Sequence, residues 1–422
     1  MLTNKDKEIL RSLATQYMEI ASLPAQQEKV KLWKALNSGN MIRPMVVLDQ
    51  LPWHEYDSDD SLRLCVEDVV WRGVEQFLRQ TVYRWENFPA DMVVEPFIPI
   101  PMAVNGYGMG HGYVIGHGYG IEIQEETIAL DKRSDIVSHN YKNQFIYDED
   151  IAKIKDIQIS HDKAETENRL MVADELFSGI VPFKASGIQF HLGMWDFLAQ
   201  YMGVTDIYTD IVERPEFIHS LIRRITDSTI QGIKQANELN LHDGNANTCH
   251  CSYVYTDELL PGPGECKGMK SHDTWAFGMA QLFTSVSPAM TEEFEIVYFK
   301  ELAEYFGGIY YGCCERMDDR LEYVLQIPNL RKVSCSPWSN RDAFAERIGS
   351  KLTMSAKPAP SFLATDSVNY DNIEDDLRQT IKTAKRYNVN LELILKDVST
   401  VRYDPKRLNK WNEIAMRLVE DC

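Results

Sequence analysis

Two adjacent cysteines, Cys313 and Cys314, follow a short apolar run in "GGIYYGCCERMDD" (307–319). A thiolate is a strong nucleophile, and thiolates, imidazoles and carboxylates are the ligands that zinc prefers in proteins. A catalytic zinc keeps three protein ligands and leaves one position open. A vicinal disulfide would close a strained ring and is the least expected state in a reducing compartment. The pair therefore consists of either metal-binding thiols or small buried hydrophobic side chains, and both interpretations stay open.

A second thiol-rich stretch, "TCHCSY" (248–253), places His250 between Cys249 and Cys251. In an extended chain Cys249 and Cys251 share one face and His250 takes the other. The same alternation places Cys313 with Tyr311 and turns Cys314 away, unless the backbone has already turned. Not all of these groups can then bind one ion. The candidate metal ligands are Cys313, Cys314, His250 and Cys251.

Other polar and aromatic side chains come directly after apolar, strand-like runs, which is where active sites of parallel α/β barrels lie. Lys357 in "MSAKPAP" is a cation that could bind an anionic group or simply cap the rim of a barrel. Trp53 can line a pocket or pack at that rim, and His191 is as compatible with a structural role as with ligand binding. The candidate catalytic residues are Glu315, Lys357 and Asp397, and the candidate substrate-binding residues are Trp53, His54, His191, Tyr253, Tyr310 and Tyr311.

Strand and helix patterns alternate four times in the last third of the chain. The predicted strands are "IYYGCC", "LRKVSCS", "KLTMSA" and "NLELILKDV", and an amphipathic helix follows each one. Such alternation requires a parallel sheet, because each helix connects neighbouring strands. Earlier candidate strands lie at 43–49, 91–97, near 181–190, at 245–253 and at 280–286. The total is close to that of a closed (β/α)₈ barrel, which we predict; an open doubly wound sheet is the alternative.

Residues 105–177 fit the barrel pattern least well. The stretch 105–120 is rich in glycine and lacks the GK[ST] ending of a phosphate loop. It is either a flexible surface turn or a mobile cover of the barrel mouth. We therefore predict one barrel domain over 1–422, with N-terminal helices over 1–40 and an insertion with a small hairpin over 105–177.

Composition excludes several classes of protein. The net charge of the 422 residues is −19, which disfavours broad binding to nucleic acid or to anionic membranes. No apolar run reaches the ~18 residues of a membrane span, and the first residues are charged rather than secretory. Eight cysteines are sparse for this length and suit a reducing cytoplasm, so we expect a cytoplasmic protein.

The order of motifs resembles the uroporphyrinogen decarboxylase superfamily. The resemblance is carried by "SPAMTEEFEIVYFKELAEYF", "IYYGCCE", "IPNLRKVSCSPWSN", "RIGSKLTMSAKPAP" and "LELILKDVST", and more diffusely by "RPMVVLDQLPWHEY" and the helical stretch after "GMWDFLAQYMG". It implies a single (β/α)₈ barrel. It also implies either decarboxylation of uroporphyrinogen or zinc-dependent methyl transfer to or from corrinoid proteins.

Two departures narrow these expectations. The decarboxylases carry an arginine-rich segment after the first strand, whereas "VVLDQLPWHEY" has no arginine. The methyltransferases carry His-x-Cys at one strand end and a second cysteine after the last strand. Cys313 matches the first cysteine, but Tyr311 stands at the histidine position, and Lys396 and Asp397 stand near the last position. A different ligand set, or a lost metal, is then implied.

The resemblance thus favours a methyltransferase that moves a methyl group between a small methylated compound, with aromatic compounds among the candidates, and a corrinoid protein. Zinc would assist, and a homodimer is compatible with the sequence. One alternative is a metal-free decarboxylase or lyase, in which Lys357 binds a carboxylated substrate and Asp49 or Asp397 protonates it. Another is a barrel that binds a ligand or partner without catalysis.

Overall fold

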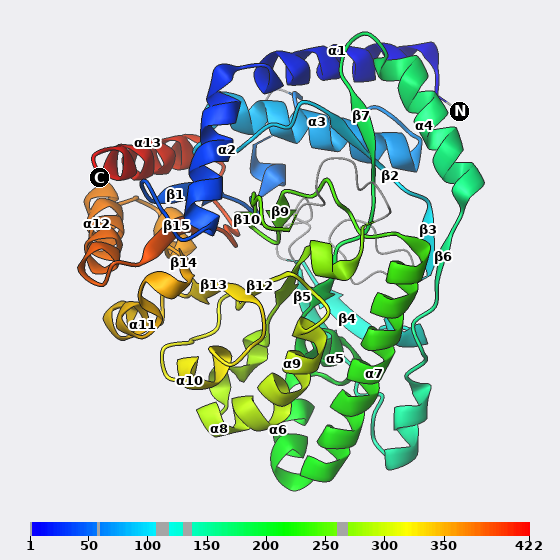
Figure 1. The fold of residues 1–422 in the computed structure, drawn as a ribbon, viewed down its shortest axis with the longest axis vertical. Helices are drawn as coiled ribbons and strands as arrows, with labels where there is room; N and C mark the ends of the chain where they lie inside the picture. Colours follow the sequence, from blue (N-terminus) through cyan, green and yellow to red (C-terminus); the bar gives the residue numbers. More distant parts are fainter. Residues whose placement is uncertain (1, 57–59, 107–117, 130–136, 260–268) are drawn as a thin grey trace.

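A parallel sheet of seven strands forms the centre of the molecule (Figure 1). The computed structural model describes residues 2–56, 60–106, 118–129, 137–259 and 269–422. The strand order is β1-β15-β14-β13-β12-β11-β8, and every pair of neighbours is parallel. The bounds are β1 (Met45–Leu48), β8 (His191–Leu192), β11 (Trp275–Gly278), β12 (Gly308–Tyr311), β13 (Leu330–Cys335), β14 (Thr353–Ala356) and β15 (Asn390–Leu395). The predicted α/β class with a parallel sheet is confirmed.

Helices connect these strands and cover their outer side. In Figure 1, α11, α12 and α13 lie outside β13, β14 and β15. The connecting helices are α8 (Pro288–Thr291), which continues through a π-helical turn (Glu292–Ile296) into α9 (Val297–Ala303), then α10 (Leu321–Val324), α11 (Arg341–Ile348), α12 (Tyr370–Arg386) and α13 (Lys406–Glu420). In α12, Asn369 caps the first turn, and Ile373, Leu377 and Ile381 are buried at the spacing of one helix face.

Among the described residues the sheet does not close into a barrel. No ladder of described residues joins β8 back to β1, and the sheet has seven strands. Shorter pieces occupy the interval between the two edges: β2 (Ile98–Pro101) pairs in parallel with β7 (Phe183–Ser186), and Ile188 forms a bridge with His242. The predicted eight-stranded closure is therefore wrong for the described residues, although the arrangement remains consistent with a (β/α)₈-like fold.

Three predicted strands differ in the structure. Residues 280–286 form a 3₁₀ helix (Gln281–Ser285), and the strand lies just before it, as β11. Residues 91–97 belong to no ladder, although Asp91 N donates to Val46 O of β1. Residues 245–253 contain β9 (Thr248–Cys249) and β10 (Ser252–Tyr253), an antiparallel pair outside the main sheet.

The N-terminal helices and the region 105–177 surround this centre. The first third of the chain forms α1 (Asn4–Ala21), α2 (Pro24–Asn37) and α3 (Val69–Asn87). Two antiparallel pairs follow, β3 (Val104–Gly106) with β6 (Ile159–His161) and β4 (Glu125–Ile128) with β5 (Ser138–Tyr141). The glycine tract lies largely outside the described residues. The remaining helices are α4 (Lys163–Phe177), α5 (Met194–Met202), α6 (Val204–Glu213) and α7 (Pro215–Leu239). None of the described helices is long and apolar enough to cross a membrane.

Successive residues of each strand face two different cores. Val46 and Leu48 pack in the outer core beneath the helices, whereas Met45 and Val47 pack in the inner core. Cys249, Cys251 and Tyr253 of the β9–β10 hairpin also belong to the inner core. The hairpin therefore packs against the inner face of the sheet, where a functional site would lie.

The interior also holds a buried ion pair. Lys332 Nζ lies 2.7 Å from Glu392 Oε2, and both side chains are fully buried. Ser252 Oγ donates to the same carboxylate at 2.7 Å, and Lys332 Nζ donates to Tyr253 O at 3.1 Å. The pair thus ties the hairpin to β13 and β15.

Candidate functional site

The end of β12 turns sharply at Gly312. Its φ is +92°, and a Cβ at this position would lie 2.6 Å from Met317 Cε, so glycine is required. Ser334 Oγ donates to Gly312 O and Gly312 N donates to Gly278 O, which fixes the turn. The turn breaks the alternation expected of a strand. Cys313 joins Tyr310 in the inner core, whereas Tyr311 lies in the outer core.

Three potential ligands converge beyond this turn, and we call Cys313, Cys314 and Asp397 the thiol cluster. Their ligand atoms all lie within 4.8 Å of one another, and it is the one such group in the described part of the chain. Cys313 Sγ is 3.7 Å from Cys314 Sγ, and Cys314 Sγ donates to Asp397 Oδ2 at 2.8 Å. Residues from the ends of β12 and β15 meet here although β13 and β14 separate the two strands.

Two cationic groups border the thiol cluster. His250 has a left-handed backbone (φ +53°) at the turn between β9 and β10, and its ring stacks on Phe277 at 3.8 Å. Its Nε2 lies 3.9 Å from Cys313 Sγ. Lys396 Nζ lies 3.0 Å from Cys313 Sγ and 2.6 Å from Asp397 Oδ2. The cluster is therefore surrounded by groups that stabilise negative charge.

The pKa values of the two thiols are shifted in opposite directions. Hydrogen bonding from Cys314, and then from His250 with the charge of Lys396, lowers the pKa of Cys313 to about 4. The negative Cys313 in turn raises the pKa of Cys314, which keeps its proton and donates it to Asp397. Burial lowers the pKa of His250, but the sulfurs of Cys251 and Cys313 outweigh burial and raise that pKa to about 9. These pKa shifts favour a thiolate at Cys313 beside an imidazolium at His250.

The remaining predicted ligand, Cys251, faces a different partner. Lys357 Nζ lies 3.5 Å from Cys251 Sγ and also bonds the hydroxyl of Tyr310, whose oxygen lies 3.2 Å from Ser334 Oγ. Burial raises the pKa of Cys251, but the positive Lys357 and His250 shift it downward overall. Cys251, Lys357 and Tyr310 thus form a second buried group, joined to the thiol cluster through His250.

The Glu315 carboxylate binds the backbone at the thiol cluster. Its carboxylate accepts from Cys313 N at 2.7 Å and from Ala280 N at 3.3 Å. Burial, followed by the charge of Cys313, raises the pKa of Glu315 to about 7. The pKa of Asp196 on α5 is raised to about 7 as well, by burial and by the charge of Glu315. Nothing in the sequence pointed to Asp196, because no motif connects α5 to the end of β12.

The Glu315→Gln variant should show a flatter dependence of stability on pH. The pKa of Glu315 is raised in the folded chain, above the usual ~4.3 of the unfolded chain, so its stabilising contribution is present below that value. The contribution is lost as pH rises toward 7, at up to ~1.4 kcal/mol per pH unit. Urea unfolding of wild type and variant between about pH 5 and pH 7 measures this slope. Equal slopes in the two proteins would contradict the assignment.

Four predicted substrate-binding residues lie away from the thiol cluster. Trp53 has edge contacts with Tyr56 and Tyr83, and His54 contacts Tyr403. Tyr311 donates to buried Glu295 at 3.0 Å on the outer side of the sheet. Tyr253 stacks on Tyr255. By contrast, His191 lies on Phe277, close to His250, and Tyr310 belongs to the second buried group.

A cleft of about 430 Å³ has a size common for small-molecule sites. Its walls come from α1 and α3 and from residues within 92–99, 186–189 and 243–255. Arg84, Glu95, Asn247 and Tyr253 are among the lining residues, and so is His250. Because His250 also contacts Cys313, it connects the cleft with the thiol cluster.

Comparisons with known proteins give a likeness in structure but not in sequence. No family model and no curated protein sequence matches this chain. Among solved structures, a methyltransferase from Methanosarcina mazei is similar over 90% of this chain and 96% of that one, with 8% sequence identity and a TM-score of 0.49. Identity and score at this level establish neither a family nor an activity for the chain.

Proposed function

We propose that this chain is a methyltransferase whose thiol cluster carries the chemistry, with zinc as its metal and a corrinoid protein on the other side of the methyl exchange. The observation that carries the proposal is the convergence of Cys313, Cys314 and Asp397 beside His250. The corrinoid protein and the small methylated substrate come from the resemblance of the sequence.

The donor atoms suit zinc. Two thiolates on a tetrahedral zinc, with Zn–S distances near 2.3 Å, stand about 3.8 Å apart. Cys313 Sγ and Cys314 Sγ are 3.7 Å apart, and His250 Nε2 is 3.9 Å from Cys313 Sγ. Asp397 would add a carboxylate oxygen. Zinc bound here would supply a Lewis acid for a methylated oxygen, nitrogen or sulfur.

Other side chains of this protein would set the charge and the position of the thiol cluster. In the metal-free chain His250 and Lys396 keep Cys313 ionised, and Glu315 fixes its backbone. Asp397 is held as an anion, because Lys396 and Cys314 outweigh the effect of burial and lower its pKa. The cleft would hold the body of the substrate. Its stacked Tyr253 and Tyr255 rings suit an aromatic compound.

The metal content of chain purified without chelator tests the proposal. We expect about one zinc per chain, by elemental analysis, and its loss in the Cys313→Ser/Cys314→Ser double variant. The Cys249→Ser/Cys335→Ser double variant is the matched control, since both thiols are buried outside the cluster. Formation of methylcobalamin from cob(I)alamin and a panel of methylated compounds then tests the reaction. A folded, zinc-free wild type would refute the zinc part.

A metal-free decarboxylase is the second candidate, and the buried Lys357 favours it. Its ammonium group lies within the inner core, where it could hold a substrate carboxylate. Asp397 is a poor proton donor for this reaction because its pKa is lowered, whereas Glu315, with a pKa of about 7, is a better one. Release of carbon dioxide by zinc-free protein would favour this candidate over methyl transfer.

A further inference from the structure

Lys396 contacts each member of the thiol cluster. Its Nζ lies 3.0 Å from Cys313 Sγ, 3.7 Å from Cys314 Sγ and 2.6 Å from Asp397 Oδ2. Its side chain is only 2% exposed, so these contacts are shielded from water. The three atoms that could bind a metal ion therefore already surround a cation.

An ammonium group and a metal ion cannot share this position. A zinc ion would lie near 2.3 Å from each sulfur, inside the space bordered by Cys313, Cys314 and Asp397. The Lys396 ammonium is directed at the same three atoms, and two positive charges at such short range repel strongly in a buried site. Binding of a metal therefore requires Lys396 to leave.

We propose that Lys396 is an internal counter-cation that occupies the metal position in the metal-free chain and must swing out before the thiol cluster closes on a divalent ion. This inference rests on the proposed function for the existence of the metal site. The ammonium neutralises the thiolate and carboxylate while no metal is bound, and it lowers the affinity of the cluster for metals.

The Lys396 side chain can move away from the thiol cluster toward solvent. Asp397 is 44% exposed and Cys314 is half-buried, so solvent reaches this side of the cluster. Lysine carries its charge on a flexible four-carbon stem, which can rotate without movement of β15. Lys396 directly follows β15, whose last residue is Leu395, so the strand keeps its register when the side chain moves.

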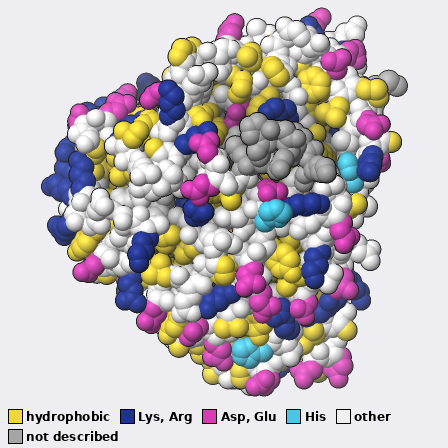
Figure 2. Space-filling model, in the orientation of Figure 1, with side chains coloured by type: hydrophobic (Ala, Val, Ile, Leu, Met, Phe, Trp, Pro, Cys, Tyr) yellow, Lys and Arg dark blue, Asp and Glu magenta, His cyan; other side chains and the backbone are white. Residues whose placement is uncertain are grey.

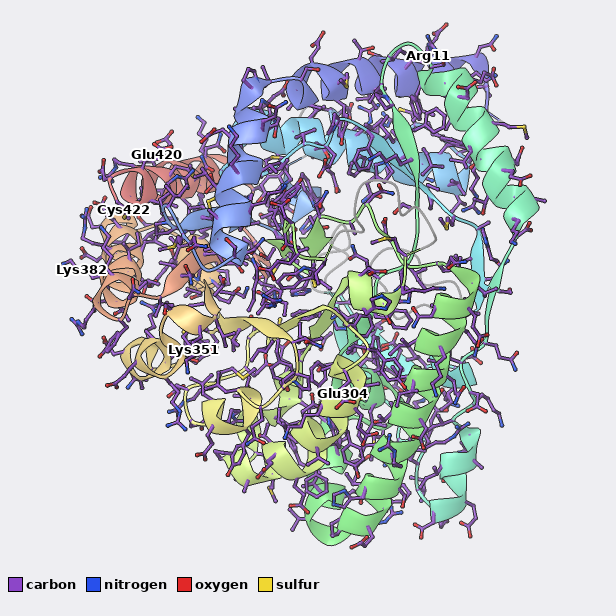
Figure 3. All side chains as sticks on the ribbon, in the orientation of Figure 1. Arg11, Glu304, Lys351, Lys382, Glu420 and Cys422 are labelled. Atoms are coloured by element: carbon purple, nitrogen blue, oxygen red, sulfur yellow. The ribbon has the colours of Figure 1, made fainter. Side chains whose placement is uncertain are left out.

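The test measures zinc affinity in reduced, chelator-stripped chain, by competition with a chromophoric chelator. Lys396→Met should bind zinc at least about tenfold more tightly than wild type, which corresponds to ~1.4 kcal/mol. Lys396→Arg keeps the charge and should stay near wild type. Lys382→Met is the control, since Lys382 lies on α12 at the periphery (Figure 3). Lys396→Gln replaces the Met variant if that one does not fold, as judged by thermal unfolding.

The outcomes separate this inference from the proposed function. Equal affinity of wild type and Lys396→Met overturns the inference and leaves the zinc site in place. Zinc binding by the Met variant alone supports the inference and refutes zinc in the wild type. Binding by neither refutes both. Acylation of lysines, followed by mass spectrometry, adds a second readout: where wild type binds zinc, labelling of Lys396 but not Lys382 should rise, and unchanged labelling overturns the inference.

Discussion

Replacing Glu392 with glutamine should lower the unfolding free energy by about 3–5 kcal/mol. The substitution leaves Lys332 as a buried charge without its counter-ion, because both side chains are fully buried at 2.7 Å from one another. Burial already lowers the pKa of Lys332, and Glu392 is what opposes that shift. Urea unfolding at neutral pH measures the loss.

Two controls separate the buried pair from a general effect of the substitution. Glu374→Gln removes a glutamate that bonds Arg378 and Arg417 on outer helices, and such exposed pairs contribute about 0–1 kcal/mol. Replacing both partners, as Lys332→Met with Glu392→Met, should recover much of the stability, since no charge is then left alone. A loss below about 1 kcal/mol in Glu392→Gln would contradict the reasoning.

The same pair bears on the functional site. Glu392 accepts from Ser252, and Lys332 donates to Tyr253 O, so the ion pair fixes the β9–β10 hairpin. His250 lies at the turn of that hairpin. A variant that loses the pair should therefore also loosen the contact between His250 and Cys313, and activity should fall together with stability.

The local sequence pattern was sufficient to predict the strands β12 to β15 and the helices that follow them. The strands β12 to β15 are short, largely buried segments, each followed by a helix, and this alternation can be read from neighbouring residues. Lys and Arg as well as Asp and Glu side chains occur on the face seen in Figure 2.

The wrong predictions concern strands whose pairing depends on residues that are distant in the sequence. The strand β8 has only two residues, and its pairing with β11 cannot be inferred from so short a segment. In 280–286, Leu282, Phe283 and Val286 are spaced as on a helix, and the segment forms a 3₁₀ turn. Residues 91–97 contain a proline and end before β2, and they pair with β1 only through Asp91.

The candidate site was predictable in its chemistry but not in its geometry. The sequence placed Cys313, Cys314 and Asp397 after strands, where side chains of a parallel sheet gather. Its alternation argument failed at Gly312, where a positive φ angle redirects the chain and separates Cys313 from Tyr311. The reach of Lys396 toward Cys313 depends on how β15 and β12 are arranged across two intervening strands, which neighbouring residues do not encode.

Cys313→Ser should have the largest effect on activity. Loss of groups that only support a metal ligand costs about 10–100-fold, so loss of the proposed ligand itself should lower kcat/KM for methyl transfer at least about a hundredfold. Serine also removes the low-pKa thiolate that His250 and Lys396 stabilise. Initial rates of methylcobalamin formation and zinc content, measured on the same preparation, give both effects.

Cys335→Ser provides the matched control for that variant. Cys335 is as buried as Cys313, with 2% and 4% exposure, but it lies in the outer core, and burial raises its pKa to about 12. It should therefore keep zinc and rate near wild type, with at most a loss of stability. If Cys313→Ser and Cys335→Ser behave alike, the thiol cluster is not the reacting centre. The buried group of Cys251, Lys357 and Tyr310 would then be the remaining candidate, because it contains the other thiol that a lysine contacts.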